Sequence, residues 1–203
     1  MVGHSRYYVS DKDAGISKGV LKNKLSINSQ KQLDNAETLL LADTYTYFFE
    51  LLRKGKLKFD LLLLFSIHEY FFGTLYDWAG KVRTVNISKD DMVFAPVKYI
   101  DKALENFSNL LKTILPKRSD AKDKVSQQLA IIHNEFNIIH PFREGNGRTI
   151  RLFLDLIAGS LGYDPIDWSK KSNSKYKKAC ILGTLDKHEA MAEIIKQGLE
   201  KSK

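Results

Sequence analysis

The stretch "HPFREGNGRTIR", residues 140–151, decides how the rest of this chain is interpreted. It brings together a histidine, an acid, an asparagine between two glycines, and three arginines. A segment that served only to fill a hydrophobic core would have little use for this mixture. The chemistry of these side chains therefore has to be explained together with the structure around them.

The residues of this stretch predict a turn between two helices. Pro141 disfavours the helical conformation for His140, so we expect one helix to end near Ile139. The next helix is expected to start near Asn146. Glycine has no Cβ, so "GNG" at 145–147 lets main-chain N–H groups converge just before that helix. Free N–H groups and the positive end of the helix dipole then point the same way, which makes such a turn an anion-binding site.

The charged side chains of the stretch fit a polyphosphate. Arg148 and Arg151 lie three residues apart, hence on one helical face, and guanidinium groups bind phosphate oxygens through paired hydrogen bonds. Glu144 beside them would repel phosphate unless a cation lay between, which indicates Mg²⁺. His140 has an ordinary pKa near neutrality and suits a general base. Together these groups indicate transfer from a nucleoside triphosphate.

Each of these features also has a simpler structural explanation. A His–Pro pair is usually structural, "GNG" is often only a turn, and arginines on a helix usually face water. The order and spacing of all of them together favour the functional interpretation.

Apolar residues recur at helical spacing along most of the chain. Asp60 is a suitable N-cap, and Gly55, Pro116 and Gly162 are suitable helix ends. The segment 149–163 is apolar nearly all round, which predicts a central buried helix. The predicted helices cover residues 35–53, 60–75, 98–115, 123–139, 149–163 and 187–199.

Residues 79–97 predict a β-hairpin, because "VRTVNI" and "MVFA" are β-prone and flank the polar turn "SKDD". Pro96 ends this hairpin. Residues 166–179 predict a polar connection to the last helix. Residues 1–30 are polar and predict an N-terminal arm, which leaves 31–203 as one domain. The expected fold is mainly α, a compact helical bundle with one β-hairpin.

The composition fits a single domain with a true core, since the chain has 203 residues and 43% hydrophobic content. The formal net charge of +8 suits a nucleic acid, a nucleotide or an acidic partner. We do not expect nucleic acid, because no helix carries basic residues interleaved with aromatic ones. Cys180 is the only cysteine, so no internal disulfide can form.

The sequence predicts no membrane association. The N-terminal stretch has no apolar h-region, and "LLLLF" at 61–65 is far shorter than the roughly 20 apolar residues of a membrane span. We expect a cytoplasmic protein, or one delivered to another cell by a route that leaves no N-terminal signature.

The long motif resembles the signature of the Fic family, H-x-F-x-[DE]-G-N-G-R-x-x-R, at every fixed position of 140–151. "VLKNKL" at 20–25, "LYDWAGKVRTVNISK" at 75–89 and "FAP" at 94–96 are similar to the same family. The related Doc-type kinases carry Lys where this sequence has Gly147, so we set that branch aside.

The resemblance implies a helical Fic fold and a protein adenylyltransferase, which moves AMP from ATP to a Ser, Thr or Tyr hydroxyl of a target protein. His140 resembles the catalytic base that deprotonates that hydroxyl. Glu144 matches the Mg²⁺ ligand. Phe142 resembles the core anchor of the loop. ATP and Mg²⁺ are therefore the expected cofactors, and UTP or GTP remain alternative donors.

The resemblance also implies how the nucleotide is held. Gly145, Asn146 and Gly147 correspond to the anion hole, and Arg148 and Arg151 match the clamp on the β- and γ-phosphates. We expect the adenine pocket to follow the motif, near Asn173 and Tyr176.

In the family the hairpin is a flap that pairs with the target segment and lies over the active site. Here residues 85–96 would form it. Lys81 is expected to bind the cofactor at the base of this flap, and Ile87 and Phe94 to dock the target. Ordinary packing is an equal alternative for Phe94.

Many Fic proteins are inhibited by a helix with the pattern [ST]-x-x-x-E-[GN]. The nearest match here is "TYFFEL" at 46–51, which ends in Leu and is interpreted as coincidental. By analogy, the inhibitor would be a small antitoxin chain that docks at Arg151, with this chain as the toxin; an unrestrained enzyme is the other alternative.

Two further interpretations stay open. One is a Fic-fold binding or adaptor protein without transferase activity, although the intact His140 and Glu144 argue against it. The other is a transferase with a different nucleotide donor. His68 and His133 are expected to pack within helices, and His4 and His188 to lie at the surface.

Overall fold

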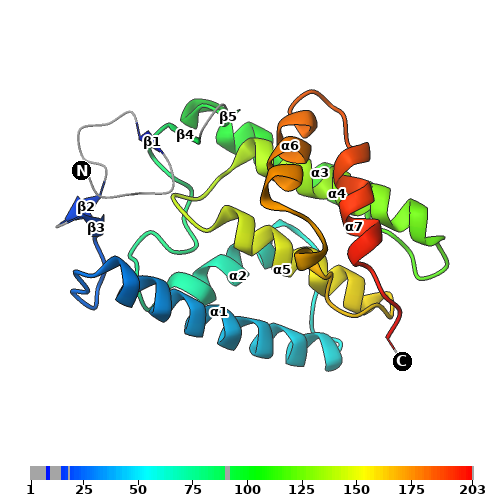
Figure 1. Ribbon diagram of the computed structural model, residues 1–203, viewed down its shortest axis with the longest axis horizontal. Coiled ribbons are helices and arrows are strands. Elements are labelled where there is room, and N and C mark those ends of the chain that lie inside the picture. Colours follow the sequence, from blue (N-terminus) through cyan, green and yellow to red (C-terminus); the bar gives the residue numbers. More distant parts are fainter. Residues whose placement is uncertain (1–7, 10–14, 18, 90–91, 203) are drawn as a thin grey trace.

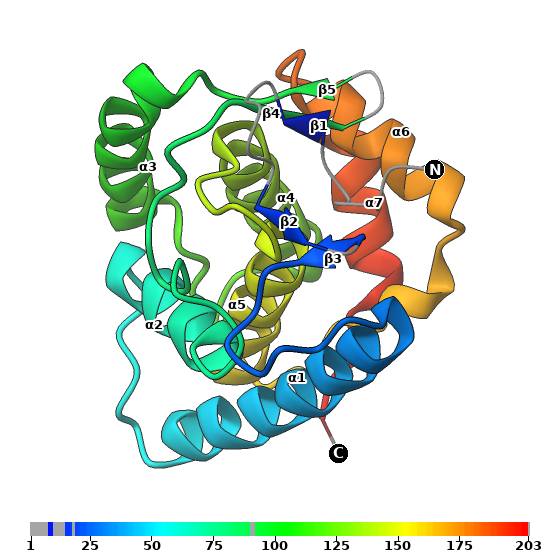
Figure 2. The ribbon, with the colours of Figure 1, turned by 90° about the vertical axis from the view of Figure 1, so that its left-hand side faces the viewer.

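The computed structural model of the protein describes residues 8–9, 15–17, 19–89 and 92–202. The predicted fold class is confirmed: the chain is mainly α, with two small sheets. Helices α4 (Lys122–Ile139) and α5 (Asn146–Ser160) form the interior, and the other helices surround them (Figures 1 and 2). These outer helices are α1 (Gln30–Arg53), α2 (Leu61–Phe72), α3 (Ile100–Ile114), α6 (Asn173–Gly183) and α7 (Glu189–Gly198).

Helix α5 is central because its sequence is apolar on nearly every side. It packs against α1, α2 and α4. Seven of its hydrophobic residues are 2% exposed or less: Ile150, Leu152, Phe153, Leu154, Leu156, Ile157 and Ala158. This core anchors the first two turns of α5, which carry Arg148 and Arg151.

The predicted helix ends are mostly confirmed. The Asp60 carboxylate accepts a hydrogen bond from the Leu63 N–H at 3.2 Å and so caps α2. Gly55 follows α1 with a positive φ of 65°, and Gly162 follows α5 with a φ of 83°. Helix α1 starts at Gln30, five residues before the predicted start at 35.

The prediction was wrong at residues 166–179, because it expected a connection without helices. A short 3₁₀ helix η2 (Trp168–Lys170) and most of α6 lie there. The Ser172 hydroxyl caps α6 by accepting a main-chain hydrogen bond at 3.3 Å. The sequence did not predict α6, because its lysines leave few apolar residues at helical spacing. The buried residues of α6 are also small, namely Ala179, Cys180 and Gly183.

The predicted hairpin is confirmed as β4 (Ile87–Lys89) paired antiparallel with β5 (Met92–Val93). Its turn at 90–91 lies outside the described residues. Strand β1 (Tyr8–Val9) adds to the other edge of β4, so the sheet order is β1-β4-β5. A 3₁₀ helix η1 (Val97–Tyr99) then leads into α3.

The N-terminal arm is more structured than its composition indicates. Strands β2 (Ile16–Ser17) and β3 (Val20–Leu21) form a second hairpin. Val20 and Leu21 are buried in a cluster with residues of α1 and α2. The division into an arm at 1–30 and a domain at 31–203 stays a prediction. Within the described part of the chain, none of the helices has the length and apolar content that a bilayer span requires.

Candidate active site

The turn between α4 and α5 depends on two residues in the left-handed region. His140 follows α4 with φ 49° and ψ 58°, and Gly145 precedes α5 with φ 79°. A Cβ on Gly145 would lie 2.1 Å from the ring of Phe72. Glycine is therefore required here both by conformation and by space. The result is that the chain reverses tightly and brings His140 close to the N-terminus of α5.

Asn146 holds this turn from inside. Its side-chain oxygen accepts from the Phe142 N–H at 2.8 Å, and its Nδ2 donates to the Phe142 carbonyl at 2.8 Å. Asn146 is 1% exposed. Its amide thus braces the loop, and the pocket described below is lined by Gly145 and Gly147 instead. The assignment of residues 145–147 to an anion hole rests on their main-chain N–H groups and stays a prediction.

Phe142 anchors the loop, as the resemblance implied. It is fully buried and stacks on His68 with ring centroids 3.7 Å apart. The Gly80 N–H donates to Nδ1 of His68 at 2.8 Å, so Nε2 carries the proton and donates to the Glu144 carbonyl at 3.0 Å. His68 is therefore a buried support of the motif. The sequence placed it in a helix but contained no signal of this role.

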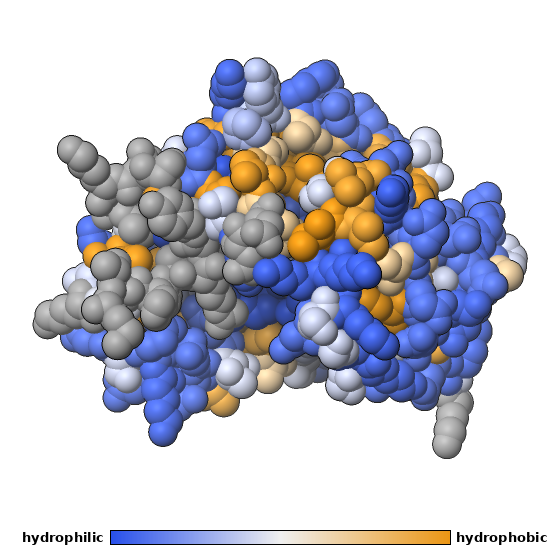
Figure 3. All heavy atoms as spheres, turned by 45° about the horizontal axis from the view of Figure 1, so that its top comes forward, coloured by the Kyte–Doolittle hydropathy of each residue, from blue (hydrophilic) through white to orange (hydrophobic). Residues whose placement is uncertain are grey.

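A pocket of about 330 Å³ opens over the turn. Its walls come from the end of α4, the turn, the start of α5, the flap and α6. On the side of the molecule that carries β4, β5 and α6, hydrophobic residues gather beside hydrophilic ones (Figure 3). Beyond the motif, the lining residues include Lys89, Met92 and Phe94 of the flap and Asn173, Tyr176 and Cys180 of α6.

His140 lines this pocket as a neutral imidazole. Burial lowers its pKa to about 3, well below its ordinary value. Nδ1 lies 2.9 Å from the Asn137 carbonyl, which can only accept, so Nδ1 carries the proton and Nε2 holds the lone pair. The ring stacks on Phe94 at 3.7 Å. From the sequence we expected a pKa near neutrality for His140. Burial instead makes His140 a weaker base, which is deprotonated at neutral pH.

Glu144 is the one carboxylate among the described residues that line the pocket. It is 3% exposed, and its Oε1 accepts from the Gly145 N–H at 3.0 Å. A buried carboxylate oxygen beside an anion site fits Mg²⁺, which binds one or two carboxylates together with substrate phosphates. The residues present therefore fit the metal that the sequence predicts.

Arg148 is already engaged on one side. Its Nη1 donates to Glu37 Oε2 at 2.5 Å, and the Tyr76 hydroxyl donates to Glu37 Oε1 at 2.7 Å. The guanidinium lies over the rings of Phe71 and Phe72. Its Nη2 is buried, 3.9 Å from Glu144 Oε1, and has no hydrogen-bond partner among the described residues. Arg148 can therefore bind a ligand through Nη2, while Nη1 stays bonded to Glu37.

Arg151 lies at the other side of the pocket, toward α6. Its Nη1 lies 3.5 Å from the Tyr176 hydroxyl. That hydroxyl also bonds to Nε2 of His133 at 2.7 Å. The predicted adenine-pocket residues Asn173 and Tyr176 both line the pocket, so the structure brings them to the motif.

Two predicted residues are not brought to this pocket. Lys81 is exposed and lines a separate hollow with Trp78, Arg83 and Arg143. Ile87 is 3% exposed and packs in a small cluster under the flap. Phe94, in contrast, both packs there and lines the pocket. Ordinary packing of Phe94 is thus confirmed, and its contact with the target stays a prediction.

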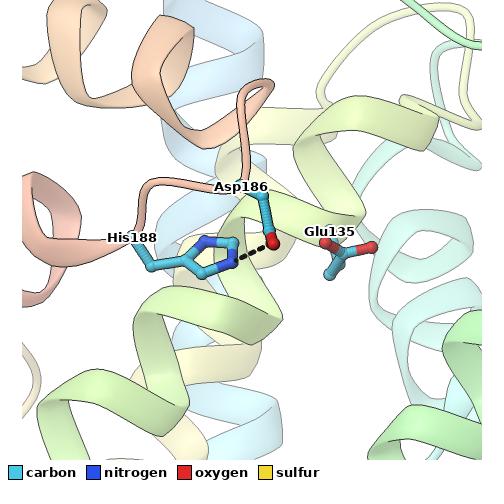
Figure 4. A group of neighbouring side chains, drawn as sticks. All are labelled: Glu135, Asp186 and His188. Atoms are coloured by element: carbon cyan, nitrogen blue, oxygen red, sulfur yellow. Dashed lines mark hydrogen bonds and ion pairs between the residues drawn. The ribbon is translucent and has the colours of Figure 1, made fainter.

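A second polar cluster lies away from the pocket: Glu135, Asp186 and His188 (Figure 4). His188 Nε2 bonds to Asp186 Oδ1 at 3.0 Å, and Asn134 Nδ2 donates to His188 Nδ1 at 3.0 Å. Both ring nitrogens are thus used to hold the loop between α6 and α7. Asp186 and His188 belong to that loop, and Glu135 lies beside them on α4.

The buried histidines make the fold sensitive to acid. Burial lowers the pKa of His68 to about 3, of His133 to about 4 and of His140 to about 3. The unfolded chain protonates them below about pH 6.5, while the folded chain does not, so stability falls as the pH drops through this window. Burial raises the pKa of Asp155 to about 6, which offsets part of the effect below that pH.

We expect the free energy of unfolding to fall by about 2–3 kcal/mol from about pH 7.5 to about pH 5.5. Urea unfolding at the two pH values measures this difference. His140→Asn should reduce the loss by about 1 kcal/mol. Equal urea midpoints at both pH values would contradict the buried neutral state of these rings.

The fold and the turn define a helical domain that presents a histidine, a carboxylate and two arginines to one pocket. Residues 58–158 match the sequence model of the Fic/DOC family. The protein adenylyltransferase VbhT of Bartonella schoenbuchensis is 35% identical over 182 residues, which cover 89% of this chain and 37% of that protein. The probable protein adenylyltransferase y4lH of Sinorhizobium fredii is 32% identical, with 80% of this chain and 82% of that protein covered.

Solved structures agree on the fold. The N-terminal Fic domain of a VirB-translocated Bep effector protein from Bartonella quintana, with bound ADP, has a TM-score of 0.73. It is 23% identical and covers 91% of this chain and 92% of that chain. The chain belongs to the Fic/DOC family, as the motif indicated. It spans little more than a third of the length of VbhT and most of the length of y4lH.

Proposed function

We propose that this chain is a protein adenylyltransferase, which transfers AMP from ATP to a hydroxyl of a target protein. The observation that carries the proposal is the neutral His140 ring in one pocket with Glu144, the N-terminus of α5 and Arg151. The names of the relatives and the ADP in the Bartonella quintana structure support it.

The chemistry follows from these positions. The target hydroxyl oxygen attacks the α-phosphorus of ATP, Nε2 of His140 accepts the hydroxyl proton, and the bond to pyrophosphate breaks. The main-chain N–H groups at the start of α5 and the Nη2 edge of Arg148 face the phosphates. Arg151 binds the terminal phosphate from the α6 side. His140 needs no deprotonation by another group, since it is already neutral.

Glu144 would hold Mg²⁺ against the phosphates. The bound ion neutralises the charge that the triphosphate brings beside this carboxylate. The nucleotide base is assigned to the wall formed by Asn173, Tyr176 and Met92. UTP or GTP as the donor remains the alternative that the pocket chemistry leaves open.

The flap is proposed to dock the target as an added strand. Strand β4 is paired on both edges, by β1 and β5, while β5 has no further strand partner among the described residues. Val93 on β5 is 81% exposed. A target segment pairing with β5 would pass over the pocket, next to Phe94 and His140. Ile87 then supports the flap from inside and does not contact the target.

We propose that this chain is a toxin and that a small antitoxin chain inhibits its active site. A glutamate on the partner helix would pair with Arg151 and exclude the terminal phosphate. Arg151→Ala should then escape inhibition by that partner, and retained inhibition would refute the pairing. The expected place of action is the cytoplasm, or a cell into which the protein is delivered.

Labelled nucleotides test the proposed function directly. Protein, Mg²⁺ and a cell lysate are incubated with ATP labelled at the α-phosphate or, in parallel, at the γ-phosphate. Adenylyl transfer labels protein from the α-position only, and mass spectrometry then shows the mass of AMP on a hydroxyl residue. Label from the γ-position would indicate a kinase, and label from α-labelled UTP or GTP would indicate another donor. No label from any donor would favour the binding or adaptor alternative.

A further inference from the structure

Arg83 is a buried arginine in the segment between α2 and β4. It is 3% exposed, and all of its side-chain hydrogen bonds among the described residues go to main-chain carbonyls. Burial lowers its pKa to about 10, so it still carries its charge at neutral pH. A buried charged group is stable only where hydrogen bonds compensate its lost hydration. The carbonyls that accept from Arg83 therefore indicate which segments it stabilises.

One side of Arg83 holds the end of α4. Its Nε donates to the His140 carbonyl at 2.8 Å and its Nη2 to the Ile139 carbonyl at 3.3 Å. Its main-chain N–H donates to the Pro141 carbonyl at 2.8 Å. The last carbonyls of a helix have no partner within the helix, and a positive charge is favourable there. Arg83 therefore caps α4 at the residue that carries the imidazole.

The other side of Arg83 holds both ends of the flap. Its Nη1 donates to the Val85 carbonyl before β4 at 2.7 Å, and its Nη2 to the Ala95 carbonyl after β5 at 2.5 Å. The Ala95 N–H in turn donates to the Ile138 carbonyl at 3.1 Å. One guanidinium thus links the flap to the C-terminus of α4.

His140 needs such support. A non-glycine residue in the left-handed region costs about 1–2 kcal/mol, and it stays there only where its neighbours hold it. Arg83 holds the His140 carbonyl, and the flap residue Phe94 stacks on the His140 ring. The main chain and the ring of His140 are thus positioned by one connected unit.

We propose that Arg83 is a positioning residue that sets the orientation of the His140 imidazole and couples it to the flap. The effect of Arg83 on AMP transfer rests on the proposed function, whereas its effect on the orientation of the His140 ring does not. Lysine would keep the charge but could not reach these carbonyls together, since it lacks the planar fork.

Arg83→Lys separates position from charge, with Arg53→Lys as the matched control. Arg53 is an exposed arginine at the end of α1, with a side-chain exposure of 76%. For Arg83→Lys we expect the rate of AMP transfer at saturating ATP to fall roughly 100-fold, with the affinity for Mg-ATP unchanged. A residue that only stabilised the fold would lower the amount of active protein and leave the rate per folded molecule unchanged.

The second readout is the NMR spectrum of nitrogen-labelled imidazoles, with His140 assigned from the loss of its signals in His140→Asn. The wild-type protein should show His140 with Nδ1 protonated, and Arg83→Lys should show a mixture of both tautomers. If Arg83→Lys does not fold, Arg83→Gln replaces it. If neither folds, the wild-type Arg83 Nε–H must show slow hydrogen exchange.

The outcomes separate the two proposals. A wild-type protein that transfers no AMP, together with altered His140 signals in Arg83→Lys, would overturn the proposed function and support the positioning. A wild-type protein that transfers AMP, with an unchanged rate and unchanged His140 signals in Arg83→Lys, would overturn the positioning. Fast exchange of the Arg83 Nε–H in the wild-type protein would overturn it as well.

Discussion

His140→Ala is expected to lower AMP transfer by a factor of about 10²–10⁴ and to leave the binding of Mg-ATP intact. The imidazole is the neutral base in the pocket, whereas the phosphates are bound by main-chain N–H groups and by the arginines. Removing the ring therefore removes proton transfer and leaves the nucleotide site in place. The measurement is label transferred from α-labelled ATP, beside calorimetric titration with Mg-ATP.

His188→Gln is the matched control for that experiment. His188 is a histidine outside the pocket, and glutamine keeps a hydrogen-bonding side chain toward Asn134 and Asp186. It should transfer AMP at the wild-type rate. Undiminished transfer by His140→Ala would mean that another group accepts the proton, and the mechanism proposed above would have to be abandoned.

Gly145→Ala is expected to destabilise the protein by about 3–5 kcal/mol. Two effects add, because the added Cβ would lie 2.1 Å from the ring of Phe72 and because alanine disfavours a φ of 79°. The turn can relax only by moving His140 and the start of α5 apart, so transfer should be lost as well. Urea unfolding measures the loss of stability.

Gly55→Ala separates the two effects. Gly55 has a similar φ of 65°, but an added Cβ would meet nothing within 4 Å. It should therefore cost only the backbone strain, about 1–2 kcal/mol. Adding Phe72→Leu to Gly145→Ala should recover part of the remaining loss. Equal effects of Gly55→Ala and Gly145→Ala would show that Phe72 does not restrict the turn.

The roles of Glu37 and Arg83 could not be predicted from the sequence. Arg83 appears in the sequence inside a β-prone run, and Glu37 inside a helix, where an acid usually faces water. Their roles come from contacts with Arg148 and with the His140 carbonyl, which lie 111 and 57 residues away along the chain. No local period or spacing encodes such a pair. Helix α6 was missed for a related reason, because it is stabilised by packing and not by an apolar stripe.

From the sequence alone follow the helical class, the turn at 140–147, the grouping of His140, Glu144, Arg148 and Arg151, and the β-hairpin within 79–97. These features depend on neighbours within a few residues, where glycine, proline and helical spacing act directly on the main chain. Only the tertiary structure decided the protonation of His140, the ion pair of Arg148 with Glu37 and the role of Arg83. Each of these is set by burial and by partners from distant segments, and burial exists only once the helices have packed around α4 and α5.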